Sequence, residues 1–116
     1  MSDTLISLRD ALRDFAAERD WEQFHTPRNL AVALTVEAGE LLEHFQWMDE
    51  AASAQLSADK RVQIGEEMAD VLLYLLRLSD KLQVDLADAA WRKLQINALK
   101  YPADKVRGSS RKYTEY

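Results

Sequence analysis

The sequence predicts an all-α fold, a small bundle of four helices. Its 116 residues contain only three glycines and two prolines, so long elements with few breaks are expected. Apolar residues recur at three- and four-residue intervals along four stretches, and no stretch shows the alternation of a half-buried strand. Four helices joined by short links form a bundle with their apolar stripes facing inward.

The first helix is expected to begin at Asp3 or Thr4, either of which can cap it. Its apolar stripe consists of Leu5, Leu8, Leu12, Phe15 and Ala16. The stripe ends there, and the helix is expected to fade around Arg19 and Asp20.

Thr26 followed by Pro27 predicts the start of the second helix, because threonine is a favoured N-cap and proline fits the first turn. No breaker follows, so this helix is expected to run for about 20 residues, to the region of Met48. Its inward stripe consists of Leu30, Ala33, Leu34, Glu37, Leu41, His44, Phe45 and Met48.

The third helix follows a small, polar connection at 53–59, in which Ser57 is a candidate cap. It is expected to end near Leu82. Its run 72–76 is apolar on more than one helix face, whereas a surface helix of a monomer has one stripe. A second subunit would bury the surplus face, so a homodimer or homotetramer is expected to complete the bundle.

The fourth helix is expected to begin after Asp85, a good cap, following a break at 83–84. Its apolar pattern continues to Ala98, and Pro102 ends it. Residues 1–102 are therefore expected to form one all-α domain. The polar stretch 103–116, which contains Gly108 followed by two serines, is expected to be a C-terminal tail or arm.

Composition argues against several classes of function. The formal net charge of −5 disfavours binding to a nucleic-acid polymer, which needs a dense basic surface, although a single nucleotide could bind through metal ions. Without cysteine the chain can form neither a disulfide nor a zinc-thiolate site. No signal peptide is recognisable, and the longest apolar run, 71–76, is too short to span a bilayer. A cytoplasmic enzyme or binding module without a membrane partner is expected.

Four acids fall on helix faces that are predicted to point inward. Glu37 continues the apolar stripe of the second helix, and Glu40 lies beside it at i+3. Glu67 and Asp70 form a similar pair in the third helix. Four carboxylates at low dielectric are costly unless a cation neutralises them, and oxygen ligands favour Mg²⁺ or Mn²⁺. Because Mg²⁺ also takes phosphate oxygens as ligands, the site suits phosphoryl or nucleotidyl chemistry.

The acids alone allow two other interpretations. A single Glu-x-x-Glu pair is usually solvated surface charge, and the sequence leaves open whether Glu66 or Glu67 points inward. The chain would then be a non-enzymatic helical interaction module. A di-iron bundle is disfavoured, because it requires two Glu-x-x-His motifs, which His25 and His44 do not complete.

The two acid pairs resemble the Glu-x-x-Glu and Glu-x-x-Asp signature of the MazG-like superfamily of all-α nucleotide pyrophosphatases, which includes dimeric dUTPases. Further segments are similar to the dCTP pyrophosphatase branch of that superfamily. They are 18–25 (ERDWEQFH), 27–30 (PRNL), 45–47 (FQW), 70–75 (DVLLYL), Lys93, Asn97 and 100–102 (KYP). The resemblance covers residues 5–102.

The resemblance implies a Mg²⁺-dependent enzyme that hydrolyses a nucleoside triphosphate between the α and β phosphates. Metal binding and catalysis would fall to Glu37, Glu40, Glu67 and Asp70. Mn²⁺ is a substitute metal, and one acid, left unspecified, would accept the proton of the attacking water. Nucleotide binding would fall to Trp21, His25, Arg28, Asn29, Trp47, Tyr74, Lys93 and Asn97.

These nucleotide-binding assignments have ordinary alternatives. A Trp is often a core residue, Tyr74 could pack within the bundle, and Lys93 could be solvated surface. The resemblance departs at Leu12, where animal members of the dCTP branch carry a histidine of the base pocket. This difference does not affect the predicted metal site, but it leaves the identity of the base in the substrate undecided. We expect dCTP or a modified dCTP, with dUTP or a damaged purine triphosphate as alternatives.

Overall fold

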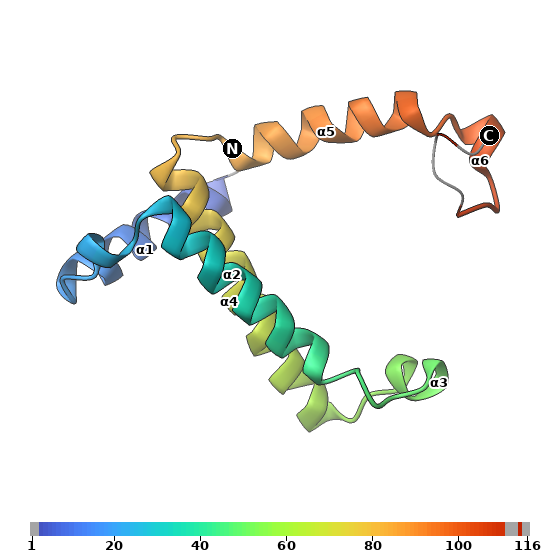
Figure 1. Ribbon diagram of the computed structural model, residues 1–116, viewed down its shortest axis with the longest axis horizontal. Coiled ribbons are helices and arrows are strands. Elements are labelled where there is room, and N and C mark those ends of the chain that lie inside the picture. The colour runs from blue at the N-terminus through green and yellow to red at the C-terminus, as the bar shows by residue number, and fades with distance from the viewer. Residues whose placement is uncertain (1–2, 111–113, 115–116) are drawn as a thin grey trace.

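Every element among the described residues is a helix, which confirms the predicted all-α class. The computed structural model describes residues 3–110 and 114 (Figure 1). In chain order its elements are α1 (Asp3–Glu18), the short 3₁₀ helix η1 (Glu22–Phe24), α2 (Pro27–Glu43), α3 (Glu50–Ala54), α4 (Ala58–Lys81), α5 (Leu86–Lys100) and α6 (Ala103–Val106).

Three predicted N-caps are confirmed. The side chain of Thr26 accepts a hydrogen bond from the backbone N–H of Asn29 at 3.2 Å, and Pro27 occupies the first turn of α2. Ser57 and Asp85 make equivalent bonds, at 3.1 and 3.0 Å, at the starts of α4 and α5. Each cap satisfies a backbone donor that the helix leaves unpaired.

Two helices end where the sequence predicts, each through a residue in the left-handed conformation. Asp20 follows α1 with φ 54° and Gln83 follows α4 with φ 56°. At both ends the next residue donates its N–H five positions back, Trp21 to Ala16 at 2.9 Å and Val84 to Ser79 at 2.8 Å. These are Schellman ends, which turn the chain sharply and satisfy the last carbonyls.

Three predicted boundaries are wrong. α1 already includes Asp3 and Thr4, so neither is its N-cap, and the residue before the helix lies outside the described residues. α2 ends at Glu43 instead of continuing to Met48. The predicted connection at 53–59 begins inside α3, because Asp49 accepts a bond from the N–H of Ala52 at 2.7 Å and starts a new helix at Glu50. This local cap competes successfully with continuation of α2.

The predicted tail also contains structure. Its first residues form α6, a single turn directly after Pro102. Residues 111–113 and 115–116 of the predicted tail lie outside the described residues.

α2 and α4 lie antiparallel and side by side, and α1 packs against α4 near the end of α4 (Figure 1). α5 instead leaves this group and extends to one side. Four apolar side chains are buried in the described part, Ala16, Leu30, Ile64 and Leu76. The radius of gyration is 17.6 Å, against about 13 Å for a compact domain of this length. Within one chain the bundle is therefore open. No described helix combines the length and apolarity needed to cross a membrane.

Candidate active site

The predicted acid site forms where α2 and α4 face each other. Glu37, Glu67 and Asp70 each offer a carboxylate oxygen, and these three oxygens lie within 4.8 Å of one another. The packing of α2 against α4 brings them together, and each of these helices buries an apolar residue of its predicted inward stripe, Leu30 and Ile64. Glu66 is exposed and Glu67 is half-buried, which resolves the choice that the sequence leaves open.

The acid site fits a hard divalent cation. Oε2 of Glu37 and Oε2 of Glu67 are buried and have no hydrogen-bond partner in the described part. Buried carboxylate oxygens are costly unless they are bonded or bound to a metal. The three ligand atoms are all carboxylate oxygens, the donors that Mg²⁺ and Mn²⁺ prefer.

The electrostatics of Glu37 show the strain of this arrangement. Burial is the largest cause, followed by hydrogen bonding to Glu40 and repulsion from Asp70 and Glu67, and together they raise the pKa of Glu37 to about 7. Glu40 thus acts on the site through Glu37 while lying outside the group of three. His44 lies at the margin, with its Nε2 4.0 Å from Oε1 of Glu67.

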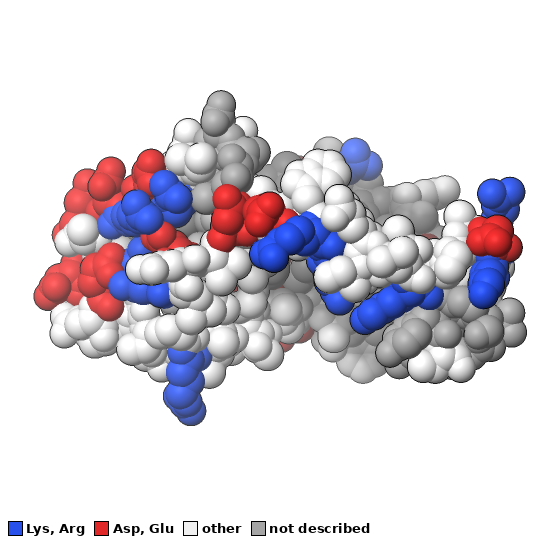
Figure 2. Space-filling model, turned by 90° about the horizontal axis from the view of Figure 1, so that it is seen from above, with Lys and Arg blue, Asp and Glu red and all other residues white. Residues whose placement is uncertain are grey.

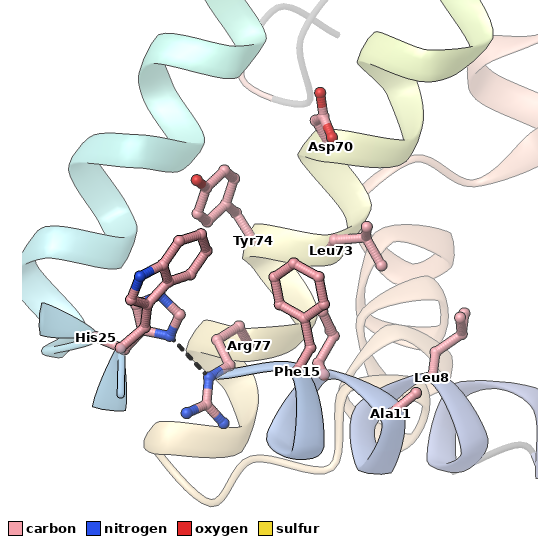
Figure 3. Close-up of a pocket in the computed structure, with 10 residues that line it drawn as sticks. Leu8, Ala11, Phe15, His25, Asp70, Leu73, Tyr74 and Arg77 are labelled. Atoms are coloured by element: carbon pink, nitrogen blue, oxygen red, sulfur yellow. Dashed lines mark hydrogen bonds between the residues drawn. The ribbon is translucent and has the colours of Figure 1, made fainter. Parts of the chain in front are cut away.

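A pocket of about 450 Å³ begins beside the acid site. It lies between α1, η1 and α4, and Asp70 contributes to its wall as well as to the acid group (Figure 3). Its lining is mostly apolar and aromatic, and consists of Leu8, Ala11, Leu12, Phe15, Trp21, His25, Asp70, Leu73, Tyr74 and Arg77. Figure 3 shows Asp70 at one end of this stretch of α4 and Arg77 at the other, with Tyr74 between them.

Aromatic rings form one wall of the pocket. Phe15 and Trp21 meet edge to face with centroids 5.7 Å apart, and Trp21 lies 6.3 Å from the His25 ring. The guanidinium of Arg19 covers the Phe15 ring at 3.6 Å from its centroid. The Schellman end of α1 places Trp21 there, because it turns the chain back immediately before η1. Such faces can stack on a nucleobase.

Arg77, which the sequence analysis missed, lies at the far end of the pocket and is only 4% exposed. It stands seven residues after Asp70, two helical turns along the same face of α4. An arginine directly after the apolar run 71–76, followed by Leu78, is the signal that could have revealed it. Its side chain contacts Glu22, His25 and Asp80.

The structure separates the predicted nucleotide-binding residues into two groups. Trp21, His25 and Tyr74 line the pocket. Trp47 does not, since it lies in the turn after α2 and is 89% exposed. Lys93 and Asn97 lie on α5, outside the pocket lining.

The remaining two predicted residues begin α2. Arg28 is exposed. Asn29 uses its side-chain amide to donate to the carbonyl of Phe24 at 3.0 Å, which ties η1 to α2. Asn29 therefore supports the loop that carries His25.

The chain is similar to known proteins. The MazG-like family model matches residues 32–116. dCTP pyrophosphatase 1 of Homo sapiens is 50% identical over 114 residues, which cover 97% of this chain and 67% of the human protein. The protein of the same name from Bos taurus is 47% identical, covering 97% and 68%.

A solved structure is similar as well. The crystal structure of a pyrophosphatase from Archaeoglobus fulgidus superposes with a TM-score of 0.70 and 38% sequence identity, covering 88% of this chain and 95% of that one. The acid pairs, the helical architecture and these relatives identify the family together: the chain belongs to the MazG-like family.

Proposed function

We propose that this enzyme is a nucleoside triphosphate pyrophosphohydrolase that cleaves between the α and β phosphates and prefers dCTP or a 5-modified dCTP. The observation that carries the proposal is one pocket with an acid site at one end and an aromatic wall at the other, joined by Asp70. The similarity to dCTP pyrophosphatase 1 supports the choice of cytosine.

The two ends of the pocket suit different parts of the nucleotide. The triphosphate belongs at the acid end, where a cation can offset the charges on both sides. The base belongs beside Trp21 and His25, where apolar and aromatic surface can stack on it. Tyr74, one turn from Asp70, lies between these ends and can offer its hydroxyl to the sugar or a phosphate.

Glu37, Glu67 and Asp70 would hold Mg²⁺, with Mn²⁺ as substitute, and Glu40 would complete the acid group. A bound cation would polarise the phosphate oxygens and neutralise part of their charge. An acid that is not engaged as a ligand accepts the proton of the attacking water, which breaks the α–β link and gives the monophosphate and pyrophosphate. Because these groups sit on two packed helices, they are held in place before substrate binds.

We also propose a homodimer or homotetramer in which α5 of one subunit approaches the site of another. The segment 86–107 carries five Lys and Arg against two Asp, whereas the chain as a whole has a net charge of −5. Figure 2 shows most of the acidic side chains gathered on the left of the molecule, with basic ones among them, and mainly basic charged side chains on the right. Lys93 and Asn97 would then reach a nucleotide from a neighbouring subunit. A cytoplasmic location and the absence of a nucleic-acid polymer as partner remain predictions from the sequence.

A substrate panel with Mg²⁺ tests the reaction. dCTP, 5-methyl-dCTP, dUTP and an oxidised purine triphosphate are compared for release of pyrophosphate and of single phosphate. We expect pyrophosphate and the monophosphate in equal amounts, fastest with the two cytosine substrates. Release of single phosphates would contradict the assigned bond, and no release from any of the four would contradict the enzyme.

Two variants test the acid site in the same assay. Glu37→Gln and Asp70→Asn are expected to lose pyrophosphate release and the rise in Tm that Mg²⁺ produces, because a ligand of the native state stabilises it by mass action. Glu66→Gln, which changes an exposed neighbour of Glu67, is the matched control and should keep both.

A further inference from the structure

Arg77 is a buried cation held by two carboxylates. Its Nη2 donates to Oε1 of Glu22, and its Nη1 lies 3.4 Å from Oδ2 of Asp80. Since Glu22 comes from η1 and Arg77 and Asp80 from α4, the guanidinium connects the loop before α2 to α4. A planar guanidinium bound on two sides has little freedom to rotate.

Two outer cations fix these carboxylates in turn. Arg13 of α1 binds Asp80 through two hydrogen bonds, of 2.7 and 2.6 Å, and Lys81 binds the second oxygen of Glu22. The bond from Arg13 is the main cause that lowers the pKa of Asp80. The bond from Lys81, followed by that from Arg77, lowers the pKa of Glu22. Both carboxylates are therefore ionised at neutral pH, and the charges alternate along the cluster.

The Nε–H of Arg77 has a different partner from the two terminal nitrogens. Nε donates to Nδ1 of His25 at 3.1 Å, and this is the bond drawn in Figure 3. Arginine has donors and no acceptor, so Nδ1 must be the unprotonated ring nitrogen. The neutral imidazole then carries its proton on Nε2, on the ring edge away from Arg77.

The surroundings oppose a second proton on His25. Burial is the largest cause that lowers its pKa, followed by the charge of Arg77; Lys81 acts in the same direction and Glu22 opposes it. Asp80 and Arg13 neutralise each other on the far side of Arg77. Protonation at Nδ1 would also place two donors face to face. A single form, neutral and protonated on Nε2, is favoured by geometry and by charge.

We propose that Arg77 is a positioning residue of the nucleotide pocket, which orients His25 so that its Nε2–H donates to an uncharged acceptor atom of the bound base. The inference rests on the proposed function, because it assigns the base to this end of the pocket. His25 and Arg77 both line the pocket, beside Trp21 and at the opposite end from Asp70. A neutral donor beside the Trp21 ring suits a ring nitrogen or carbonyl oxygen better than a phosphate, whose charge belongs at the acid end.

The tautomer can be measured without any nucleotide. Protonated and unprotonated ring nitrogens of histidine have well-separated ¹⁵N chemical shifts, and the chain contains only two histidines. His25→Gln identifies the signals of His25 by their loss. At pH 7.5 we expect the full-length wild type to show unprotonated Nδ1 and protonated Nε2. A protonated Nδ1, or an equal mixture of tautomers, would overturn the proposal.

Arg77→Lys tests the positioning role, since lysine keeps the charge but lacks the fixed planar fork. We expect mixed tautomers of His25 and a kcat within twofold of the wild type. The KM for dCTP should rise about five- to tenfold, which is the loss of affinity expected for one neutral hydrogen bond. Arg77→Met is the second variant. There Glu22 should draw a proton onto Nδ1, and the titration midpoint of His25 should rise.

Arg61→Lys is the matched control, the same change at an exposed position of α4, and should leave the ¹⁵N pattern and KM unchanged. Retention of the wild-type pattern and KM in Arg77→Lys would overturn the proposal, as would a fall in kcat at constant KM. These outcomes can be distinguished from a failure of the proposed function. Failure of the wild type to release pyrophosphate would contradict that function and leave the tautomer measurement intact.

Discussion

At the scale of single residues, Glu37 shows how a site can be destabilising without its ligand. Its carboxylate is placed on the seam between α2 and α4, near Glu67 and Asp70, where burial and like charge oppose ionisation. Without a cation the folded protein keeps a proton on Glu37 up to a pH of about 7. The unfolded chain releases that proton near the ordinary value of 4.5.

This difference predicts the pH dependence of stability in the absence of metal. Because the pKa of Glu37 is raised on folding, its contribution to stability is present below about pH 4.5 and is lost as pH rises through about 7. In EDTA, the free energy of unfolding should fall over this range with a slope of at most about 1.4 kcal/mol per pH unit for one proton. Urea denaturation from pH 4.5 to 8 measures it.

Glu37→Gln should flatten this slope, and Mg²⁺ should reverse it, because metal binding requires the deprotonated acid and releases its proton. The exposed Glu66→Gln should keep the slope of the wild type. An identical slope in Glu37→Gln would show that another group carries the pH dependence.

Helical periodicity predicts which acids share a face, and Glu37 and Glu67 are both half-buried. It left open the choice between Glu66 and Glu67, and Asp70 is exposed although its helix face was predicted to point inward. The metal-binding role of these acids stays a prediction. Arg77 could not be recognised in that way. The role of Arg77 depends on Glu22 and His25, which lie more than fifty residues away in the chain. No local sequence pattern predicts that η1 lies beside α4.

At the scale of elements, the caps determine which sequence expectations hold. Thr26, Ser57 and Asp85 start helices as predicted, because each bond is made within three residues. The end of α2 was not predictable by the same logic. Residues 44–48 are compatible with a helix, and it is the new cap at Asp49 that favours the turn before α3.

The backbone conformation of Gln83 at the end of α4 costs conformational free energy, which can be tested. Gln83 adopts φ 56°, a conformation that costs a residue with a Cβ roughly 1–2 kcal/mol and costs glycine almost nothing. Gln83→Gly should therefore raise the free energy of unfolding by about 1 kcal/mol, measured by urea denaturation at fixed protein concentration. Gln83→Ala is the matched control, since alanine retains the Cβ and should change little. Equal effects of the two changes would show that the lost glutamine side chain, not the backbone, matters.

At the scale of the whole molecule, the chain exposes more apolar surface than an isolated domain of this size should. Only four apolar side chains are buried in the described part, whereas Met68 and Leu72 of α4 and its C-cap Leu82 are exposed. Of these, Leu72 belongs to the run 72–76, for which a surplus apolar face was predicted. On α5, Trp91 and Leu94 are 70% and 58% exposed. Surfaces of this kind mark interfaces between proteins. The all-α class was predictable from one sequence, whereas the closure of the bundle by another chain stays a prediction.

Trp91→Glu distinguishes an isolated chain from an oligomer. In a single chain the change would cost little, because the side chain is already 70% exposed. If another subunit buries Trp91, the change should lower stability by about 3 kcal/mol per subunit and favour smaller species.

Light scattering after size exclusion should give the wild type a mass of two or four times 13.3 kDa, with a Tm that rises with protein concentration. Gln95→Glu, an exposed polar position of the same helix, should keep both properties. A wild type of 13.3 kDa with a concentration-independent Tm would mean that the open bundle is stable alone.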